Sequence, residues 1–332
     1  MTQKKDYRRF ILTIVLLLCL LIIFFLINIS TGSVRIPLSH ILDRDQVIIR
    51  QIRLPRALLS MIIGGALAVS GFLLQTYFRN PIAGPFVLGI SSGAKMAVAI
   101  LLFMSVSFSA RLSSLSMVLA AFAGSMAVIV FLVLISSHIS GIAPLLIAGI
   151  MTGYICNAVC DMLVTFFSDN DIINLHNWTR GSFSGADMRS VHISFIIVLA
   201  CFIIVLALSK PIEALMLSES YAFTMGVNVK RLRILIIIIS GILSATAAAF
   251  AGPVSFVGVA VPFLASRFLG NTRPLFVIPA AFLTGSLMCL VCDLMARTLF
   301  SPTELNISTV TSIIGAPVVI IMIIKNKRDQ GA

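Results

Sequence analysis

The chain alternates long apolar runs with short polar segments. A helix of about 18 apolar residues is long enough to cross the hydrocarbon core of a bilayer. The runs predicted to span it are Phe10–Ile27, Ala57–Tyr77, Met117–Ile135, Pro144–Phe167, Val191–Leu208, Ile234–Phe250, Pro274–Thr298 and Val310–Ile324. Two more apolar stretches, entered through Leu88–Gly93 and Gly252–Pro262, contain the Gly and Pro residues that break helices. The pattern predicts an all-α polytopic membrane protein with about ten transmembrane helices, two of them broken.

Composition excludes several other classes of protein. Hydrophobic residues make up 59% of the chain and charged residues 11%, which is far from the balance of a soluble domain. A membrane β-barrel is excluded because polarity does not alternate in short segments. The formal net charge of +12 does not indicate nucleic-acid binding, since the basic residues are scattered at the ends of apolar runs without an aromatic RNA motif.

The basic residues orient the predicted spans. Four of them precede the first apolar run: Lys4, Lys5, Arg8 and Arg9. That run is longer than the apolar part of a signal peptide, and no small-residue cleavage pattern follows it. We therefore expect a retained first span with a cytosolic N-terminus, because Lys and Arg favour cytoplasmic loops. An even number of spans would return the basic tail at 325–328 to the cytosol.

The segment from Lys210 to Arg233 lies between two predicted spans and is too polar to cross a bilayer. Ser218 can cap a short helix and Gly226 can end it, while basic residues at both ends of the segment favour the cytosol. A capped, partly apolar helix presented to the cytosol over residues 213–230 suggests a docking element for a partner. The alternative is an ordinary loop lying on the lipid surface.

The first predicted outer loop, residues 28–55, carries more cations than the orientation rule expects. The cations in and next to it are Arg35, Arg44, Arg50, Arg53 and Arg56, against only Asp43 and Asp45. An acidic partner outside the membrane would account for the excess. Exposed charge without a partner is the alternative.

A few ionisable residues fall within the predicted spans, where charge is costly. Asp161 is expected to be buried and to need a partner, whereas Asp293 and Arg297 have the i,i+4 spacing of a helical ion pair. Together with Lys95, these acids suggest the alternative function of an ion-coupled secondary transporter. The Gly-Pro breaks in both halves of the chain hint at the inverted repeat of such transporters, but the charges are sparse for a proton relay.

Motifs for catalysis or for a cofactor are absent from the sequence. The chain lacks a G-x-x-x-x-G-K-[ST] loop, an H-E-x-x-H or G-x-S-x-G motif, and paired carboxylates for acid–base chemistry. Its six cysteines lie in apolar runs with no nearby His to complete a metal site, which favours packing over a metal pair. The sequence predicts a transport protein that is no enzyme, needs no cofactor or metal, and takes its energy from another chain.

Short motifs follow one another in a specific order along the whole chain. In the first half they are Arg53-Leu54-Pro55-Arg56, Arg79-Asn80-Pro81-Ile82-Ala83 and Leu88-Gly89-Ile90-Ser91-Ser92-Gly93. In the second half they are Gly181-Ser182-Phe183, Phe256-Val257-Gly258, Asp293 with Ala296-Arg297, Glu304-Leu305, and Ile314-Gly315-Ala316-Pro317. This series resembles the FecCD-type (BtuC-like) permeases, the membrane subunits of ABC importers for ferric siderophores, haem and cobalamin. One departure is Gly84, which stands where the family's turn has an acidic residue.

The resemblance implies a single transmembrane permease domain over residues 1–332, embedded in the lipid of the bacterial cytoplasmic membrane. It implies four further partners: a second permease, identical or different, two cytosolic ATPase subunits, and an extracellular or periplasmic binding protein. The implied function is import of an iron–siderophore-type chelate, driven by ATP that the separate subunits hydrolyse.

The resemblance also assigns roles to residues of this chain. The helix that docks the ATPase corresponds to Ser218–Val227, with Ser218, Glu219, Ala222 and Gly226 at matching positions. The arginines that meet glutamates of the binding protein correspond to Arg53, Arg56 and Arg297. The cytosolic gate corresponds to the turn Ser140, Gly141, Ile142 and Ala143.

Overall fold

The computed structural model describes residues 2–32, 47–108, 113–136, 138, 142–301 and 303–330, and every regular element within these ranges is a helix. In chain order they are α1 (Thr2–Ser30), η2 (Ile49–Arg53), α2 (Leu54–Phe78), α3 (Ile90–Phe108), α4 (Ser114–Ser136), α5 (Ile142–Val164), α6 (Asp169–Thr179), α7 (Met188–Ala207), α8 (Ser209–Leu217), α9 (Glu219–Thr224), α10 (Val229–Ala251), α11 (Val257–Leu269), α12 (Pro274–Thr298) and α13 (Ile307–Gln330). η2 is a π-helix that continues directly into α2. The all-α class is confirmed.

Eight stretches of helix in the described ranges are long and apolar enough to cross a membrane. They lie in α1, η2 with α2, α4, α5, α7, α10, α12 and α13. The two stretches that we expected to be broken form shorter apolar helices, Ile90–Ser105 within α3 and the whole of α11. Pro262 lies inside α11, and the backbone from Gly252 to its start is not helical, so α11 is short for a span. The expected ten spans therefore appear as eight full-length candidates and two short helices.

The bounds of α12 agree with the predicted run, whereas those of α1 do not. α12 begins at Pro274 and ends at Thr298, as predicted. α1 extends beyond Phe10–Ile27 in both directions, because its charged first turns and its polar last turn are helical too. The region 168–187, which separates two of the predicted spans, contains the helix α6, which Ser168 caps.

The helix α2 lies at the centre of the bundle and packs against α10, α11 and α12. Its small residues allow the backbones to come close. A Cβ on Gly71 would overlap the backbone of Gly258 on α11, and a Cβ on Gly64 would overlap the backbone of Gly285 on α12. Lipid supplies no hydrophobic force that drives helices together, so such close packing holds a membrane bundle.

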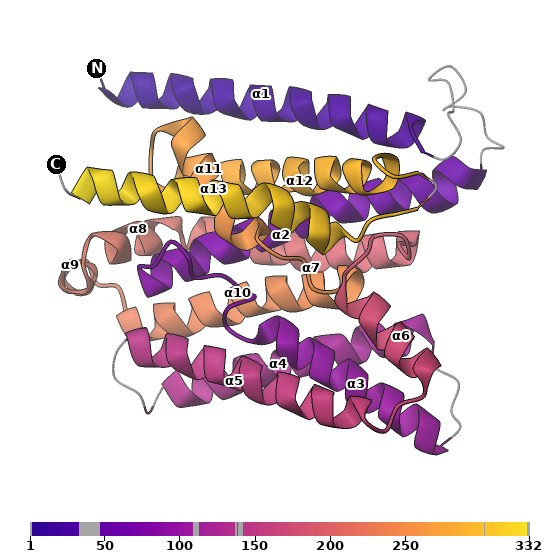
Figure 1. Cartoon of the computed structure of the whole chain (residues 1–332). Coiled ribbons are helices and arrows are strands. Elements are labelled where there is room, and N and C mark those ends of the chain that lie inside the picture. Colours follow the sequence, from indigo (N-terminus) through magenta and orange to yellow (C-terminus); the bar gives the residue numbers. More distant parts are fainter. Residues whose placement is uncertain are drawn as a thin grey trace.

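The two ends of the bundle carry different elements. Figure 1 shows α1 along one edge of the bundle and α3, α4 and α5 along the opposite edge. The N- and C-terminal ends lie at the same end of the bundle as α9, and α6 lies at the other end. These are called the α9 end and the α6 end below. The shared position of the termini agrees with an even number of crossings between them.

Two sequence-based expectations about individual residues can be compared with the structure. Asp161 is exposed on α5, so the expectation that it is buried with a partner is wrong. It lies on a helix face that also presents Met151 and Tyr154 outward, and the apolar sequence around Asp161 therefore does not mark a core position. Five of the six cysteines are buried, in agreement with packing: Cys156, Cys160, Cys201, Cys289 and Cys292.

Candidate functional site

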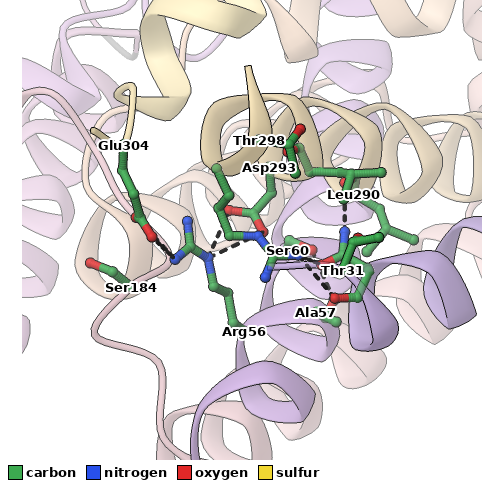
Figure 2. Close-up of polar contacts among 12 residues, drawn as sticks. Thr31, Arg56, Ala57, Ser60, Ser184, Leu290, Asp293, Thr298 and Glu304 are labelled. Atoms are coloured by element: carbon green, nitrogen blue, oxygen red, sulfur yellow. Dashed lines mark hydrogen bonds and ion pairs between the residues drawn. The ribbon is translucent and has the colours of Figure 1, made fainter. Parts of the chain in front are cut away.

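An ionic cluster lies at the α6 end, where α2 and α12 meet the segment between α12 and α13. The Nε of Arg56 donates to both carboxylate oxygens of Asp293, at 3.0 and 3.2 Å. The Nη1 of the same guanidinium lies 3.1 Å from an oxygen of Glu304. Figure 2 shows the Arg56 side chain between the two carboxylates, one from α12 and one from the segment that leads into α13. Arg56 therefore joins three parts of the chain.

Arg297 extends the cluster to α1. It follows Asp293 by one turn of α12, and its Nε lies 3.5 Å from that carboxylate, which confirms the predicted i,i+4 pair. Its Nη2 donates to the backbone carbonyl of Asn28 at 3.0 Å and also contacts the Asn28 side chain. Arg53 binds the end of the same helix, since its Nη1 donates to the carbonyl of Ile29 at 2.7 Å. The carbonyls that end α1 are thereby capped by cations, which a helix C-terminus favours.

All three arginines of this cluster are buried. Arg53 is 5% exposed, Arg56 6% and Arg297 9%, whereas the Glu304 side chain is 48% exposed. The sequence placed Arg53 and Arg56 in or next to an outer loop, but η2 and α2 continue the helix through both positions. Their guanidinium groups therefore face other helices, and their role in docking a binding protein stays a prediction. Arg35 and Arg44 lie outside the described residues.

The short helix α9 is positioned at the opposite end by caps on both sides. The hydroxyl of Ser218, whose backbone is extended, accepts from the amide of Tyr221 at 3.0 Å. Gly226 has φ +79°, and the next amide, that of Val227, donates back to the carbonyl of Ala222 at 3.0 Å. Both predicted ends of the helix are confirmed. The predicted region 213–230 differs in one respect, because residues 209–217 form a second helix, α8.

The α9 segment exposes apolar side chains outside the predicted spans. Phe223 is 76% exposed and Met225 63%, while Ala222 is fully buried beneath them. Glu219 pairs with Arg233 at the start of α10, which holds the first turn of α9 against the bundle. An exposed aromatic and thioether patch of this kind suits contact with another protein.

Two polar contacts connect α8 to the ends of α2 and α12. Arg79, which ends α2 in a left-handed conformation, donates to the carbonyl of Leu215 at 3.4 Å. Arg273, which precedes α12, lies 3.6 Å from Glu213. A cavity of about 290 Å³ lies beside these contacts, lined by residues of α2, α8, α11 and α13. A displacement of α8 and α9 would therefore act on α2 and α12, the same two helices that carry the ionic cluster.

The predicted gate is described only in part. Ser140 and Gly141 lie outside the described residues. Ile142 is the first residue of α5, and Ala143 is exposed in its first turn.

The structure also reveals members of the ionic cluster that sequence reasoning did not assign to the site. Glu304 was noted only as part of a motif, and Asn28 was not noted at all. Asp293, considered above for an ion-coupled relay, is paired with two arginines. Arginine keeps its proton throughout the physiological pH range, so this pairing does not favour a proton relay through Asp293.

Comparison with known proteins agrees with this architecture. The FecCD transport family matches residues 20–325 of the chain. The haemin transport system permease protein HmuU of Yersinia pestis is 33% identical over 280 residues, which are 84% of each chain. The vitamin B12 import system permease protein BtuC of Salmonella typhi is 29% identical over 326 residues, which are 98% of each chain. A solved structure of an inward-facing metal-chelate type ABC transporter matches with a TM-score of 0.86 and 28% identity, over 94% of this chain and 98% of the other.

These findings define the class of protein and then its family. A bundle of eight candidate spans with this structural match is the integral membrane permease subunit of an ABC importer. The chain belongs to the FecCD transport family. As such a subunit it is not itself an enzyme, and the ATPase is a separate protein.

Proposed function

We propose that this permease imports an iron–siderophore-type chelate across the bacterial cytoplasmic membrane. The observation that carries the proposal is the family match over nearly the whole chain, residues 20–325, together with an exposed capped helix at one end of the bundle. Relatives named for haem and vitamin B12 transport support a bulky chelate, already coordinated, as the cargo. The pathway then needs no metal ligands of its own.

We propose that the α9 end faces the cytosol and that residues 1–332 form one permease domain. The basic residues near both termini and around α9 support this orientation. The α9 segment, with Ser218, Glu219, Ala222 and Gly226, would dock on an ATPase subunit. Its partners would be two such subunits and a second permease, identical or different.

Motion in this proposal passes from α9 through α8 to the transmembrane helices. Closure of the ATPase dimer displaces α9, and the contacts of Arg79 with Leu215 and of Arg273 with Glu213 transmit the displacement to α2 and α12. The two permeases then exchange between outward-open and inward-open states. The turn from Ser140 to Ala143 would close the cytosolic side.

The α6 end would receive the binding protein that delivers the chelate. Arg53, Arg56 and Arg297 would attract its acidic residues, which is electrostatically suited to a cluster with three arginines and two carboxylates. Burial sets a condition on this contact. An incoming carboxylate can reach Arg56 only where Glu304 now lies, because the Asp293 side chain is 1% exposed whereas that of Glu304 is 48% exposed.

Transport by reconstituted components tests the proposal. The permease would be placed in vesicles with its ATPase and the cognate binding protein, and uptake of a ferric siderophore, haem and cobalamin would be compared. We expect uptake that requires ATP and survives collapse of the proton gradient, with the siderophore complex preferred. Accumulation without any ATPase subunit would contradict the proposed mechanism. Preference for haem or cobalamin would contradict the proposed identity of the cargo but not the mechanism.

A further inference from the structure

A groove of about 540 Å³ opens between α1, α2, α7 and α12, and its lining includes no residue of the ionic cluster or of α9. Its wall is almost wholly apolar and includes Leu21, Leu58, Met61, Phe195, Leu199 and Leu283. The hydroxyl of Ser286 also lines it, but this oxygen lies 2.7 Å from the carbonyl of Met61 and 2.9 Å from that of Phe282. That hydroxyl is therefore satisfied within the protein, and the groove presents a hydrocarbon surface.

The groove is shorter than the hydrocarbon core of a bilayer is thick. On α7 it is lined from Met188 to Phe202, a length of about 21 Å at the α-helical rise per residue. Phe202 and Phe282 close its inner end, with ring centroids 5.0 Å apart. The hydrocarbon core of a bilayer is roughly 30 Å thick. The groove thus begins at the α6 end of α7 and stops before it crosses the whole of that core.

The lining residue His192 and the exposed Arg189 lie at the surface end of the groove. His192 lies in the lining, and its Nδ1 is 2.6 Å from the carbonyl of Met188, so Nε2 is the ring nitrogen that points away from the helix backbone. Arg189 is exposed one turn before His192 on α7. The nearby Asp187 caps α7, because its carboxylate accepts from the amide of Ser190 at 2.9 Å, and its charge also attracts Arg189. That hydrogen bond lowers the pKa of Asp187 and fixes the carboxylate as the cap of α7.

We propose that this groove binds an anionic glycerophospholipid of the leaflet at the α6 end. An acyl chain lies along α7 as far as Phe202, and the phosphate lies beside Arg189 and His192. A transmembrane helix of another protein fits less well, since it would need about 30 Å of continuous contact across both leaflets. The bound lipid would fill the space between α1 and α7, whose most apolar stretches are largely exposed in the bundle.

Mass spectrometry of the intact protein can test the proposal without any transport assay. The full chain, purified in detergent, would be incubated with phosphatidylglycerol and with phosphatidylcholine in equal amounts. We expect at least one phosphatidylglycerol molecule to remain bound, at severalfold higher occupancy than phosphatidylcholine. Equal occupancy by the two lipids, or loss of both at the lowest activation energy, would overturn the proposal.

Two pairs of variants locate the bound lipid. Arg189→Gln should abolish the preference for the anionic lipid, whereas Arg180→Gln, which removes another exposed cation directly after α6, should keep it. Leu199→Trp places an indole in the groove and should displace the lipid, whereas Ile196→Trp on an exposed face of α7 outside the lining should not. Full retention of phosphatidylglycerol by Leu199→Trp would place the lipid elsewhere and overturn the assignment. Arg189→Gln changes only an exposed side chain, so it gives a result even where the Trp variant fails to insert.

Discussion

Arg56 on α2 and Asp293 on α12 form a buried ion pair, with Nε 3.0 Å from Oδ1, although 237 residues separate them in sequence. The same carboxylate lies 3.5 Å from Arg297. One acid thus serves two guanidinium groups where little water reaches them. In such a setting the charges are tolerated only together, and removal of one partner leaves the others uncompensated.

The first prediction concerns that shared carboxylate. Asp293→Ala leaves Arg56 and Arg297 buried with less compensation, so we expect a loss of stability of about 3–5 kcal/mol. Thermal unfolding of the purified protein in detergent measures the effect. Glu213→Ala is the matched control, because it breaks an ion pair of α8 that is exposed on both sides and should change stability by less than about 1 kcal/mol. Equal unfolding temperatures for the two variants would contradict the structural role of Asp293.

The second prediction concerns the end of α9. Gly226 has φ +79° and no atom within 4 Å of the position of a Cβ, so a side chain there meets no clash but does meet backbone strain. Gly226→Ala should cost about 1–2 kcal/mol locally, and Gly226→Asn less, since Asn tolerates the left-handed conformation. Hydrogen exchange of amides in residues 219–227 should become faster in the Ala variant.

A matched glycine controls for that substitution. Gly185 also has open space around its Cβ position, and it does not have a positive φ. Gly185→Ala should therefore leave hydrogen exchange unchanged in α9 and in its own segment. Unaltered exchange in Gly226→Ala would show that the left-handed residue does not hold the end of α9.

The third prediction tests the exposed patch of α9. Phe223 is 76% exposed, so Phe223→Asp should leave the fold intact while placing a charge at the proposed contact with the ATPase. We expect the ATPase to be lost when the permease is purified and uptake to fall at least tenfold. Phe300→Asp is the control, because this residue is 64% exposed beyond the last turn of α12, at the other end of the bundle. Normal recovery of the ATPase with the Phe223 variant would show that α9 is not part of the interface with the ATPase.

Local chemistry explains which features could be predicted from the sequence. The cap at Ser218 and the left-handed Gly226 act within four residues of the helix they delimit, and both were found. The pair of Asp293 with Arg297 was also found, because one helical turn sets it. Each of these depends on spacing along the chain, which a sequence displays directly.

The features that were missed depend on how distant helices pack. Nothing near Arg56 shows that Glu304 will face it, since the two residues are 248 positions apart in the sequence. A run of arginines before an apolar segment suggests an exposed loop, and only the continuous helix of η2 and α2 turns these side chains inward. The expected burial of Asp161 was wrong for a related reason. An apolar neighbourhood in a membrane helix occurs on lipid-facing and partner-facing surfaces as well as in the core.

The last prediction separates the structural role of the ionic cluster from its proposed docking role. Glu304 holds Arg56 from the exposed side, with Nη1 and Oε2 3.1 Å apart and its own side chain 48% exposed. A half-exposed pair of this kind contributes up to about 1 kcal/mol, so Glu304→Gln should barely change the unfolding temperature. Asp293 still compensates Arg56 in that variant.

The same substitution should tighten the binding of the partner that docks at the α6 end. A carboxylate of the binding protein must replace Glu304 to reach Arg56, and the neutral amide of Glu304→Gln competes more weakly for that guanidinium. The dissociation constant of the binding protein should fall by up to about fivefold, and the gain should shrink as salt is added. Titration of the binding protein against the permease in nanodiscs, at low and high salt, measures both effects. An unchanged dissociation constant at low salt would mean that Arg56 serves the fold alone, and the docking contact would then have to be sought on other residues of the α6 end.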